Sequence, residues 1–308
     1  MRVRVIVNPK AGSGSAARRL PEILREIERS GALSDSAETR AAGDAARLVR
    51  EAREEGIDCV AVLGGDGTFN EACQAYIDDQ GRACAGPDLA VIPSGTGGDF
   101  RRTFQLGTST QEAVARLMSS AARPVDLGVI DAVAHDGTMR RHAFVNITSF
   151  GMGGLTDRIV NRSPKWMGGR VAFFVAALRA LAVYRNAPVR VTVDDEVCVE
   201  GPIVNVMIAN GRYFGGGMKI APDADPSDGL FDIVVIGDVS RSKSLSFTPH
   251  IYRGTHVDQP GVLVRRGRVV RAEPLVKDLE VLIDMDGETP GRLPLEARLL
   301  PCALRVRI

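Results

Sequence analysis

The sequence predicts an α/β N-terminal domain with a parallel sheet, followed by a β-rich C-terminal domain of the sandwich or barrel type. Two observations predict this division. The chain up to about residue 125 alternates short apolar runs with helix-like stretches, and the rest consists mainly of apolar runs separated by turns. With 308 residues, the chain can form about two domains that each bury a core. We place them at residues 1–125 and 126–291.

The N-terminal domain is predicted from strand candidates at residues 3–7, 59–63 and 89–92 and from helix candidates at 16–28, 44–54, 68–77 and 111–119. Glycine-rich loops follow the three strands directly, at residues 8–14, 64–68 and 93–99. Ligands of open parallel sheets bind at the carboxyl ends of the strands. We therefore expect the three loops to converge on one site.

The C-terminal domain is predicted from seven short apolar runs, at residues 189–193, 197–199, 203–209, 231–236, 262–264, 269–270 and 279–283. One stretch, residues 167–184, has a helical pattern instead. Its Phe173, Phe174, Leu178 and Leu181 lie at helical spacing. This spacing favours packing in a core, and lining of an acyl-chain pocket is the alternative.

The turn formed by Gly64, Gly65, Asp66, Gly67 and Thr68 is the most informative segment. Its glycines let backbone N–H groups approach an anion, and the helix expected after it favours negative charge at its N-terminus. A carboxylate beside phosphates usually implies a divalent cation between them. The turn therefore predicts a nucleotide phosphate site with a metal ion. The alternative is a plain strand-to-helix turn whose glycines only permit positive φ.

The first glycine-rich loop contains Asn8, Pro9, Lys10 and Gly12. Its glycines and its lysine suit a phosphate, and an ordinary turn between a strand and a helix explains it equally well. The loop matches neither the GxxxxGK[ST] phosphate loop nor the GxGxxG dinucleotide fingerprint. Alone, it therefore leaves both interpretations open.

The third glycine-rich loop contains Gly95, Thr96 and Asp99. Thr96 is a candidate N-cap for a helix that begins near Gly97. Asp99 repeats the setting of Asp66, because both carboxylates lie in a glycine-rich loop at the end of a strand. This repetition favours a metal or phosphate role over capping alone.

Two acidic segments lie in the second half of the chain. Asp284, Asp286 and Glu288 fall within five residues at the end of a late strand. Turn chemistry accounts for Asp286, whereas Glu288 is either a general base at the mouth of a cleft or a solvated glutamate. The loop at residues 222–230, with Asp225 and Asp228, is either a cation site or a plain solvated loop.

Composition excludes several classes of protein. The formal net charge of +1 gives no indication of nucleic-acid binding. The five cysteines show no CxxC spacing, which favours a reducing cytoplasm over a disulfide framework or a zinc site. No apolar run approaches the roughly 20 residues of a membrane span. A basic run, Arg265, Arg266, Arg268 and Arg271, is either a charged edge strand or a contact with an anionic membrane surface.

Taken together, these motifs resemble the diacylglycerol kinase catalytic-domain family, bacterial lipid kinases related to sphingosine and ceramide kinases. The resemblance covers nearly the whole chain. Its motifs are VNPKAGSG at 7–14, Thr39 with residues 43–45, GGDGTFNEA at 64–72, IPSGTGGDF at 92–100, PVDLG at 124–128, PDADPSDGLFD at 222–232 and DGE at 286–288. The resemblance implies a nucleotide domain of the NAD-kinase and diacylglycerol-kinase type. It leaves open whether a last strand, about residues 292–308, returns to this domain.

The resemblance also implies roles for individual residues. Those that would contact ATP are Asn8, Pro9, Lys10, Gly12, Thr39, Gly64, Gly65, Asp66, Gly67, Thr68, Glu71, Gly95 and Thr96. Glu288 falls on the general base, and Asp66 would hold Mg²⁺ on the β- and γ-phosphates or orient the acceptor. A structural Mg²⁺ site would use Asp228 and the backbone carbonyls of Asp225 and Leu230. Asp99 and Asp126 would connect that site to the nucleotide through water.

The expected activity is ATP-dependent phosphorylation of a lipid hydroxyl, on diacylglycerol or on a sphingoid or ceramide-type lipid. The expected cofactors are ATP and Mg²⁺. We expect a cytoplasmic protein that acts peripherally at the inner membrane face, and a homodimer is compatible with the resemblance. Two alternatives stay open: an NAD kinase, against which Asn70 and Glu71 argue, and a non-catalytic nucleotide- or lipid-binding protein.

Overall fold

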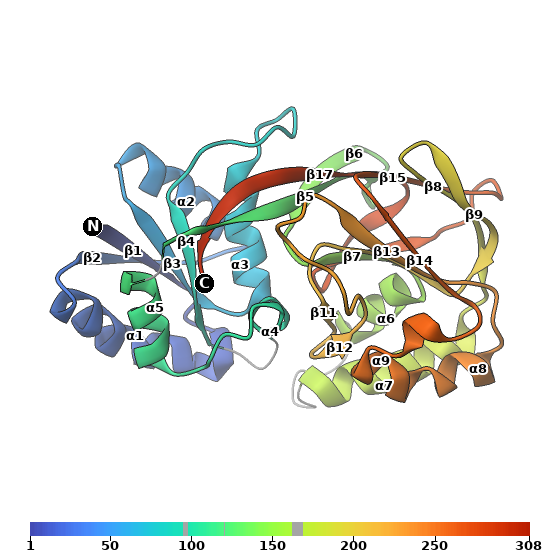
Figure 1. Cartoon of the computed structure of the whole chain (residues 1–308), viewed down its shortest axis with the longest axis horizontal. Helices are drawn as coiled ribbons and strands as arrows, with labels where there is room; N and C mark the ends of the chain where they lie inside the picture. Colours follow the sequence, from blue (N-terminus) through green and yellow to red (C-terminus); the bar gives the residue numbers. More distant parts are fainter. Residues whose placement is uncertain (95–97, 120, 162–168) are drawn as a thin grey trace. The chain divides into compact units, whose positions relative to one another are not determined.

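The computed structural model of the chain describes residues 1–94, 98–119, 121–161 and 169–308. The chain divides into two compact units (Figure 1). The N-terminal unit comprises Met1–Leu127 together with Leu300–Ile308, and the C-terminal unit comprises Gly128–Leu299. Two long strands, β5 (Arg123–Val133) and β17 (Glu288–Arg307), have residues in both units.

The N-terminal unit contains a parallel sheet in the strand order β17, β4, β3, β1, β2. Its remaining strands are β1 (Arg2–Val7), β2 (Leu33–Glu38), β3 (Cys59–Gly64) and β4 (Asp88–Pro93). Its helices are α1 (Ala11–Arg29), α2 (Asp44–Glu54), α3 (Asp66–Cys73), η1 (Gln74–Tyr76), α4 (Asp99–Thr103) and α5 (Thr110–Ser119). The carboxyl end of β17 joins this sheet, because Val306 pairs with Leu89 in β4.

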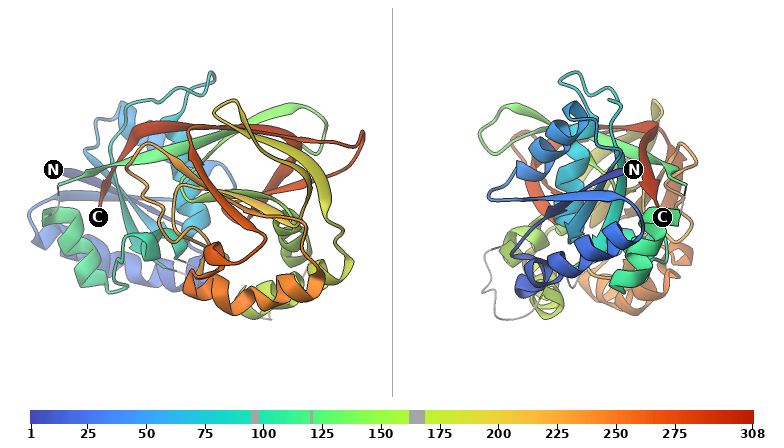
Figure 2. Two further views of the ribbon diagram at one scale, coloured as in Figure 1. Left: turned by 45° about the vertical axis from the view of Figure 1, so that its right-hand side comes forward. Right: turned by 90° about the vertical axis from the view of Figure 1, so that its left-hand side faces the viewer.

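Helices cover both faces of this sheet, with α1 and α5 on one face and α2 and α3 on the other (Figure 2). Alternate residues of a strand point to opposite faces. Val3, Val5 and Val7 accordingly pack in one apolar cluster with Ile23 of α1 and Leu117 of α5. Strand β2 was not among the predicted strands. It lies at the edge of the sheet, and its sequence LSDSAE is largely exposed, so it has no apolar pattern to detect.

The C-terminal unit consists mainly of antiparallel strands. These are β6 (Met139–Phe144), β7 (Ile147–Gly151), β8 (Ala187–Val193), β9 (Glu196–Ile203), β10 (Asn205–Ala209), β11 (Tyr213–Phe214), β12 (Met218–Lys219), β13 (Phe231–Ile236), β14 (Val262–Gly267), β15 (Val269–Pro274) and β16 (Leu282–Met285). One run of paired strands is β14, β13, β10, β7, β16 and β17, and a second is β17, β15, β8 and β9. The predicted fold class, a parallel α/β domain followed by a β-rich domain, is confirmed.

Four α-helices of the C-terminal unit lie together along one side of its strands: α6 (Met152–Asn161), α7 (Gly169–Val183), α8 (Arg241–Ser246) and α9 (Thr248–Arg253), with the short helix η3 (His256–Asp258) after them (Figures 1 and 2). Helix α6 packs very closely on β16. A Cβ atom at Gly154 would lie 2.4 Å from the Leu282 carbonyl oxygen, so only glycine permits this contact. Helices α6, α8 and α9 were not predicted.

Candidate functional site

The three glycine-rich loops of the N-terminal unit meet at the carboxyl ends of β1, β3 and β4, as expected. The Asn8 side-chain amide donates to the Thr68 hydroxyl over 3.1 Å, which joins the first loop to the second. The hydroxyls of Ser15 and Ser94 lie 3.1 Å apart, which joins the first to the third. The Ser94 N–H donates to the Gly64 carbonyl over 2.9 Å. The described parts of the three loops are therefore joined to one another by hydrogen bonds.

Asp66 holds the third loop in place. Its carboxylate accepts hydrogen bonds from the backbone N–H groups of Gly98 at 2.7 Å, Asp99 at 2.9 Å and Phe100 at 3.4 Å. Asp66 is itself the first residue of α3, and the three donors form the start of α4. A carboxylate at a helix start is stabilised by the free N–H groups there. Asp66 therefore organises the backbone at the start of α4.

The first loop contains an unusual turn. Gly12, Ser13 and Gly14 have φ values of 56°, 55° and 82° inside the segment assigned to α1. Turns of this kind direct successive backbone N–H groups toward one point, which suits an anion. A Cβ atom at Gly12 would lie 3.2 Å from the Ser94 hydroxyl and 2.3 Å from that of Ser15. Glycine therefore lets the first and third loops approach each other.

The other predicted ATP contacts lie around these loops. Lys10 is exposed, and its N–H donates to the Asn8 side chain at 3.1 Å. Thr39 follows β2 and donates its N–H to the Val7 carbonyl at 2.9 Å. Glu71 accepts from the N–H of Ala45 at 2.8 Å, in the first turn of α2.

Five further predicted ATP contacts can be placed only in part. Gly95 and Thr96 lie outside the described residues. Pro9 follows Asn8 in the first loop, and Gly65 and Gly67 flank Asp66 in the second.

In the C-terminal unit, Glu288 follows a tight hairpin turn between β16 and β17. Asp286 and Gly287 have φ values of 49° and 90°, and Met285 pairs with Glu288 across the turn. Two successive residues with positive φ are typical of the type I′ hairpin turn. The Asp286 carboxylate accepts from the N–H groups of Ile147 at 2.9 Å and Val145 at 3.2 Å. These bonds fix the turn against the start of β7.

Two buried carboxyl groups, those of Asp284 and Asp157, lie next to this turn. Asp284 accepts from the Gly287 N–H at 3.1 Å and from the Ser149 hydroxyl at 3.2 Å. Burial raises the pKa of Asp284 well above its usual range, and neighbouring Asp157 on α6 raises it further. Burial also raises the pKa of Asp157, which hydrogen-bonds to Asp284. Burial and the proximity of the two groups therefore both favour a protonated carboxyl in this pair.

Asp286 is the third carboxyl of this group. Burial raises its pKa to about 7, although its backbone N–H donors oppose the shift. Asp157 was not predicted to belong to the site. Nothing in the sequence links it to Asp284, because 127 positions along the chain separate residues 157 and 284 and only the packing of α6 on β16 brings them together.

Glu288 itself is exposed and lines an open hollow of about 470 Å³ together with His142, Met285 and Thr289. Burial lowers the pKa of His142, and the Arg140 charge lowers it further. Both effects favour the neutral imidazole of His142, which lines the same hollow as Glu288. Its place in this hollow was not predicted, because it follows from the position of β6 in the fold.

The predicted structural metal ligands Asp225, Asp228 and Leu230 share one loop. The Asp228 carboxylate accepts from the Leu230 N–H at 3.0 Å and forms an ion pair with Arg266. The same guanidinium lies 3.6 Å from the carboxylate of buried Asp232. The described residues contain no group of three or more metal-ligating side chains. Arg266 therefore compensates the charge of Asp228 in this structure, and the metal role of these residues remains a prediction.

Asp99 and Asp126, predicted to act through water, both lie in the N-terminal unit. Asp99 forms an ion pair with Arg102 at 2.7 Å. Asp126 is fully buried and accepts from the Cys302 N–H at 2.7 Å. Both carboxylates therefore have structural partners within their own unit.

An apolar pocket of about 120 Å³ lies between the helices and strands of the C-terminal unit. Its described lining comes from α6 to α9 and from β10 to β13, and it includes Met152, Leu178, Leu181, Met207, Phe214, Ile251 and Tyr252. None of the described lining residues carries a charge. Leu178 and Leu181 thus line a pocket, while the side chains of Phe173 and Phe174 lie outside the described part of the chain.

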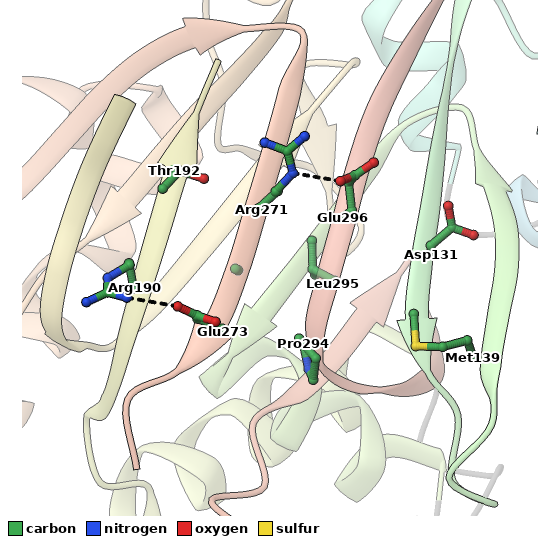
Figure 3. A pocket seen from close by; sticks show the side chains of 10 residues that line it. Asp131, Met139, Arg190, Thr192, Arg271, Glu273, Pro294, Leu295 and Glu296 are labelled. Carbon is green, nitrogen blue, oxygen red and sulfur yellow. Dashed lines mark hydrogen bonds and ion pairs between the residues drawn. The ribbon is translucent and has the colours of Figure 1, made fainter. Parts of the chain in front are cut away.

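A second hollow of the C-terminal unit, about 410 Å³, lies over β8, β15 and β17 (Figure 3). Its cations are paired with acids. Arg190 contacts Glu273 at 3.1 Å, and Arg271 contacts Glu296 at 2.7 Å. Because these charges compensate one another, the hollow offers little attraction to a phosphate.

Two family models match the chain. One, described as the diacylglycerol kinase catalytic domain, matches residues 2–130. The other, described as the YegS C-terminal NAD kinase beta sandwich-like domain, matches residues 146–308. The diacylglycerol kinase of Mycobacterium tuberculosis (strain ATCC 25618 / H37Rv) is 32% identical over 99% of this chain and 94% of its own length. The chain belongs to the diacylglycerol kinase catalytic-domain family.

This family consists of lipid kinases, and a kinase family implies ATP as the phosphate donor, usually with a divalent metal. Another relative, the diacylglycerol kinase of Bacillus subtilis (strain 168), is 28% identical over 95% of this chain and 91% of its own length. A crystal structure from Bacillus anthracis str. Sterne, provisionally described as a diacylglycerol kinase, matches with a TM-score of 0.79 at 26% identity, over 99% of this chain and 94% of that one.

The crystal structure of yeast NADH kinase is a more distant match to this chain. It matches with a TM-score of 0.53 at 11% identity, over 99% of this chain and 82% of that one. At this identity the likeness shows a shared fold alone.

Among the described residues, no helix is both long and apolar enough to span a bilayer.

Proposed function

We propose that this protein transfers the γ-phosphoryl group of MgATP to the hydroxyl of a lipid, either diacylglycerol or a sphingoid or ceramide-type lipid. The observation that carries the proposal is the apolar pocket of the C-terminal unit, whose described lining has no charged side chain. An acyl chain suits such a lining, whereas a dinucleotide acceptor requires charged or polar contacts to its phosphates. The pocket therefore favours a lipid acceptor over NAD.

The nucleotide would bind at the connected loops of the N-terminal unit. The turn at residues 12–14, the start of α3 and the side chain of Lys10 would place N–H groups and one positive charge around the phosphates. Phosphoryl transfer depends mainly on positioning and on neutralisation of charge. Asp66 would hold the Mg²⁺ of MgATP or orient the acceptor, and in either case its bonds to residues 98–100 would keep the loop in shape.

Glu288 would act as the general base. It would take the proton from the lipid hydroxyl while the hydroxyl oxygen forms a bond to the γ-phosphorus. The bond from that phosphorus to the β–γ bridging oxygen breaks, and ADP leaves. Exposure of Glu288 in an open hollow gives an acceptor room to reach it. The hydrogen bonds that fix the Asp286–Gly287 turn would limit the freedom of the base, which favours catalysis through orientation.

The acceptor can be tested directly. Purified protein is incubated with radiolabelled ATP, Mg²⁺ and one acceptor at a time: diacylglycerol, a sphingoid base, ceramide, phosphatidylglycerol or NAD. We expect label in one class of lipid and none in NAD. Label in NAD would identify an NAD kinase, and no label with any acceptor would favour a non-catalytic binding protein. We expect the enzyme to work at the inner membrane face, where ATP and lipid are both present.

A further inference from the structure

Asp157 is a buried carboxyl to which the proposed reaction gives no role. It lies on α6 and is 6% exposed, and its Oδ2 atom has no hydrogen-bond partner among the described residues. Its side chain hydrogen-bonds to the carboxyl of Asp284. A buried carboxyl with an unpartnered oxygen costs free energy, and an apolar side chain of similar size would avoid that cost. Stability alone therefore does not explain an acid at this position.

Contacts on both sides of Asp157 in the sequence hold α6 against β16. Gly154 packs so closely on this strand that a Cβ atom there would lie 2.4 Å from the Leu282 carbonyl oxygen. On the other side, Arg158 forms an ion pair at 3.0 Å with Glu280, which precedes the strand. The helix therefore holds its buried carboxyl at one place beside β16.

Asp284 links Asp157 to the turn that precedes Glu288. The Asp284 carboxylate accepts from the Gly287 N–H at 3.1 Å and from the Ser149 hydroxyl at 3.2 Å. Two carboxyls can hydrogen-bond to each other only while one of them carries a proton, and burial favours that state. Two successive hydrogen bonds therefore connect α6 to the residue directly before Glu288.

We propose that Asp157 is a positioning residue for Glu288 and that it acts through Asp284. The inference rests on the proposed function, in which Glu288 is the general base. Gly287 has a φ of 90° and no side chain, so its peptide is restrained only through backbone bonds such as the one to Asp284. Asp157 would keep the Asp284 carboxyl directed at this peptide, and the peptide would keep Glu288 in reach of the acceptor hydroxyl.

The first test is a double-mutant cycle between residues 157 and 288, measured as turnover of the lipid that becomes labelled. Asp157→Ala removes the partner of Asp284, and we expect kcat to fall by about 10- to 100-fold with the KM for ATP unchanged. In a Glu288→Gln background, whose residual turnover is followed with radiolabelled ATP, the same change should cost less than about twofold, because no base is left to position. An equal fold-loss in both backgrounds would overturn the proposal, as would an unchanged kcat in Asp157→Ala.

A conservative variant and a matched control separate the carboxyl from the helix that carries it. Asp157→Asn keeps a side chain that can hydrogen-bond to Asp284, so its kcat should lie within about threefold of wild type. Arg158→Ala changes the next residue of α6 and removes only the ion pair to Glu280, so it should keep the wild-type kcat. If this control lost as much activity as Asp157→Ala, docking of the helix would account for the effect and the proposal would be wrong. Circular dichroism checks that each variant folds.

The second measurement needs no substrate. Hydrogen exchange of residues 284–290 reports the freedom of the turn, and residues 64–72 of the N-terminal unit serve as the internal reference. In Asp157→Ala, exchange at 284–290 should be about tenfold faster than in wild type, and exchange at 64–72 should be the same. If Asp157→Ala fails to fold, Asp157→Leu, which fills the space without a hydrogen bond, replaces it in both measurements.

Failure of this inference and failure of the kinase proposal are distinguishable. Unchanged exchange at residues 284–290 would overturn the inference, whichever acceptor becomes labelled. Faster exchange at these residues, with no acceptor labelled, would support the link between Asp157 and the turn and would overturn the kinase proposal instead.

Discussion

Two aspartate–glycine turns, one in each unit, organise a neighbouring segment of backbone in the same way. In the N-terminal unit, the Asp66 carboxylate accepts hydrogen bonds from the backbone N–H groups of residues 98–100. In the C-terminal unit, the Asp286 carboxylate accepts hydrogen bonds from the backbone N–H groups of residues 145–147. Each turn therefore joins two loops through one carboxylate.

The surroundings of the two turns differ. Asp66 lies among glycine-rich loops that offer backbone donors, with Lys10 nearby in the first loop. Asp286 lies beside Asp284 and Asp157, and it precedes Glu288. Under the proposed function, the N-terminal turn would serve the phosphates of the nucleotide and the C-terminal turn would serve the proton of the acceptor hydroxyl. The comparison teaches that the same device, a carboxylate that caps backbone N–H groups, can support opposite chemical tasks.

Replacement of Glu288 should give the largest effect. We expect Glu288→Gln to lower kcat by about 10²–10⁴-fold, because the amide cannot accept the proton of the lipid hydroxyl. Binding of ATP, measured by calorimetry, should stay unchanged, because the proposed nucleotide contacts lie in the N-terminal unit.

The matched control for this variant is Glu296→Gln, which changes the same residue type on the same strand. Glu296 pairs with Arg271 in the charge-compensated hollow (Figure 3). Its variant should retain activity within a factor of about 2, since exposed ion pairs contribute little. A Glu288→Gln enzyme as active as this control would exclude Glu288 as the base.

Replacement of Asp66 should affect the nucleotide instead. We expect Asp66→Ala to weaken ATP binding and to lower kcat/KM by about 10²-fold, because residues 98–100 lose their acceptor. Asp66→Asn keeps one oxygen for the N–H groups of Gly98 and Asp99. It should therefore restore most of the ATP affinity, and if it also restores turnover, the carboxylate charge has no role with Mg²⁺. Unchanged ATP affinity in Asp66→Ala would show that the comparison of the two turns is wrong.

The sequence predicts the sheet of the N-terminal unit well because its central strands are buried on both faces. Residues 59–63 are wholly apolar, and β3 occupies Cys59–Gly64. Strands that lie at an edge or that alternate weakly, such as β2 and β6, lack this signal and were missed. The end of β17 pairs with β4 across more than 200 positions of sequence, from Val306 to Leu89, and only the motif resemblance indicated such a return.

The site was predictable to the extent that its residues are adjacent in sequence. Glycine loops and the DGE segment are local patterns, so their members could be named. The hydrogen-bond and ion-pair partners that hold these segments in place lie far from them in the sequence. Asp157 reaches Asp284 through the close contact of Gly154 with β16, and Arg266 reaches Asp228 through the pairing of β14 with β13. No spacing rule predicts such pairs, because they depend on tertiary packing.

The buried carboxyl pair should make stability depend on pH. Since the pKa of Asp284 is raised above its ordinary value of 3.8, the folded state binds more protons than the unfolded state above about pH 4. The free energy of unfolding should therefore fall as the pH rises from about 4 toward the raised pKa. Asp284→Asn keeps an oxygen for the Gly287 N–H and removes this charge. It should match wild type near pH 4 and exceed it by on the order of 1 kcal/mol near pH 8.

Chemical unfolding across this pH range measures the effect, and Asp66→Asn serves as the control from the other turn. The control shows how much stability is lost when an amide replaces a carboxylate that accepts backbone N–H groups elsewhere in the fold. If Asp284→Asn were less stable than wild type at pH 8, the Asp157–Asp284 pair would be held as two stabilised charges and would not share a proton.

Replacement of Glu71 should give the smallest effect. Its variants distinguish a role in the stability of the fold from a role in ATP binding. The motif resemblance assigns it to ATP, yet its carboxylate accepts the Ala45 N–H at 2.8 Å in the first turn of α2. If capping is its task, Glu71→Ala should lower the free energy of unfolding by about 1 kcal/mol, and ATP affinity should stay the same. Glu71→Gln, which retains an acceptor oxygen, should recover most of that stability. A loss of ATP affinity in Glu71→Gln, with stability intact, would instead assign its charge to the nucleotide and place a second carboxylate, besides Asp66, at that surface.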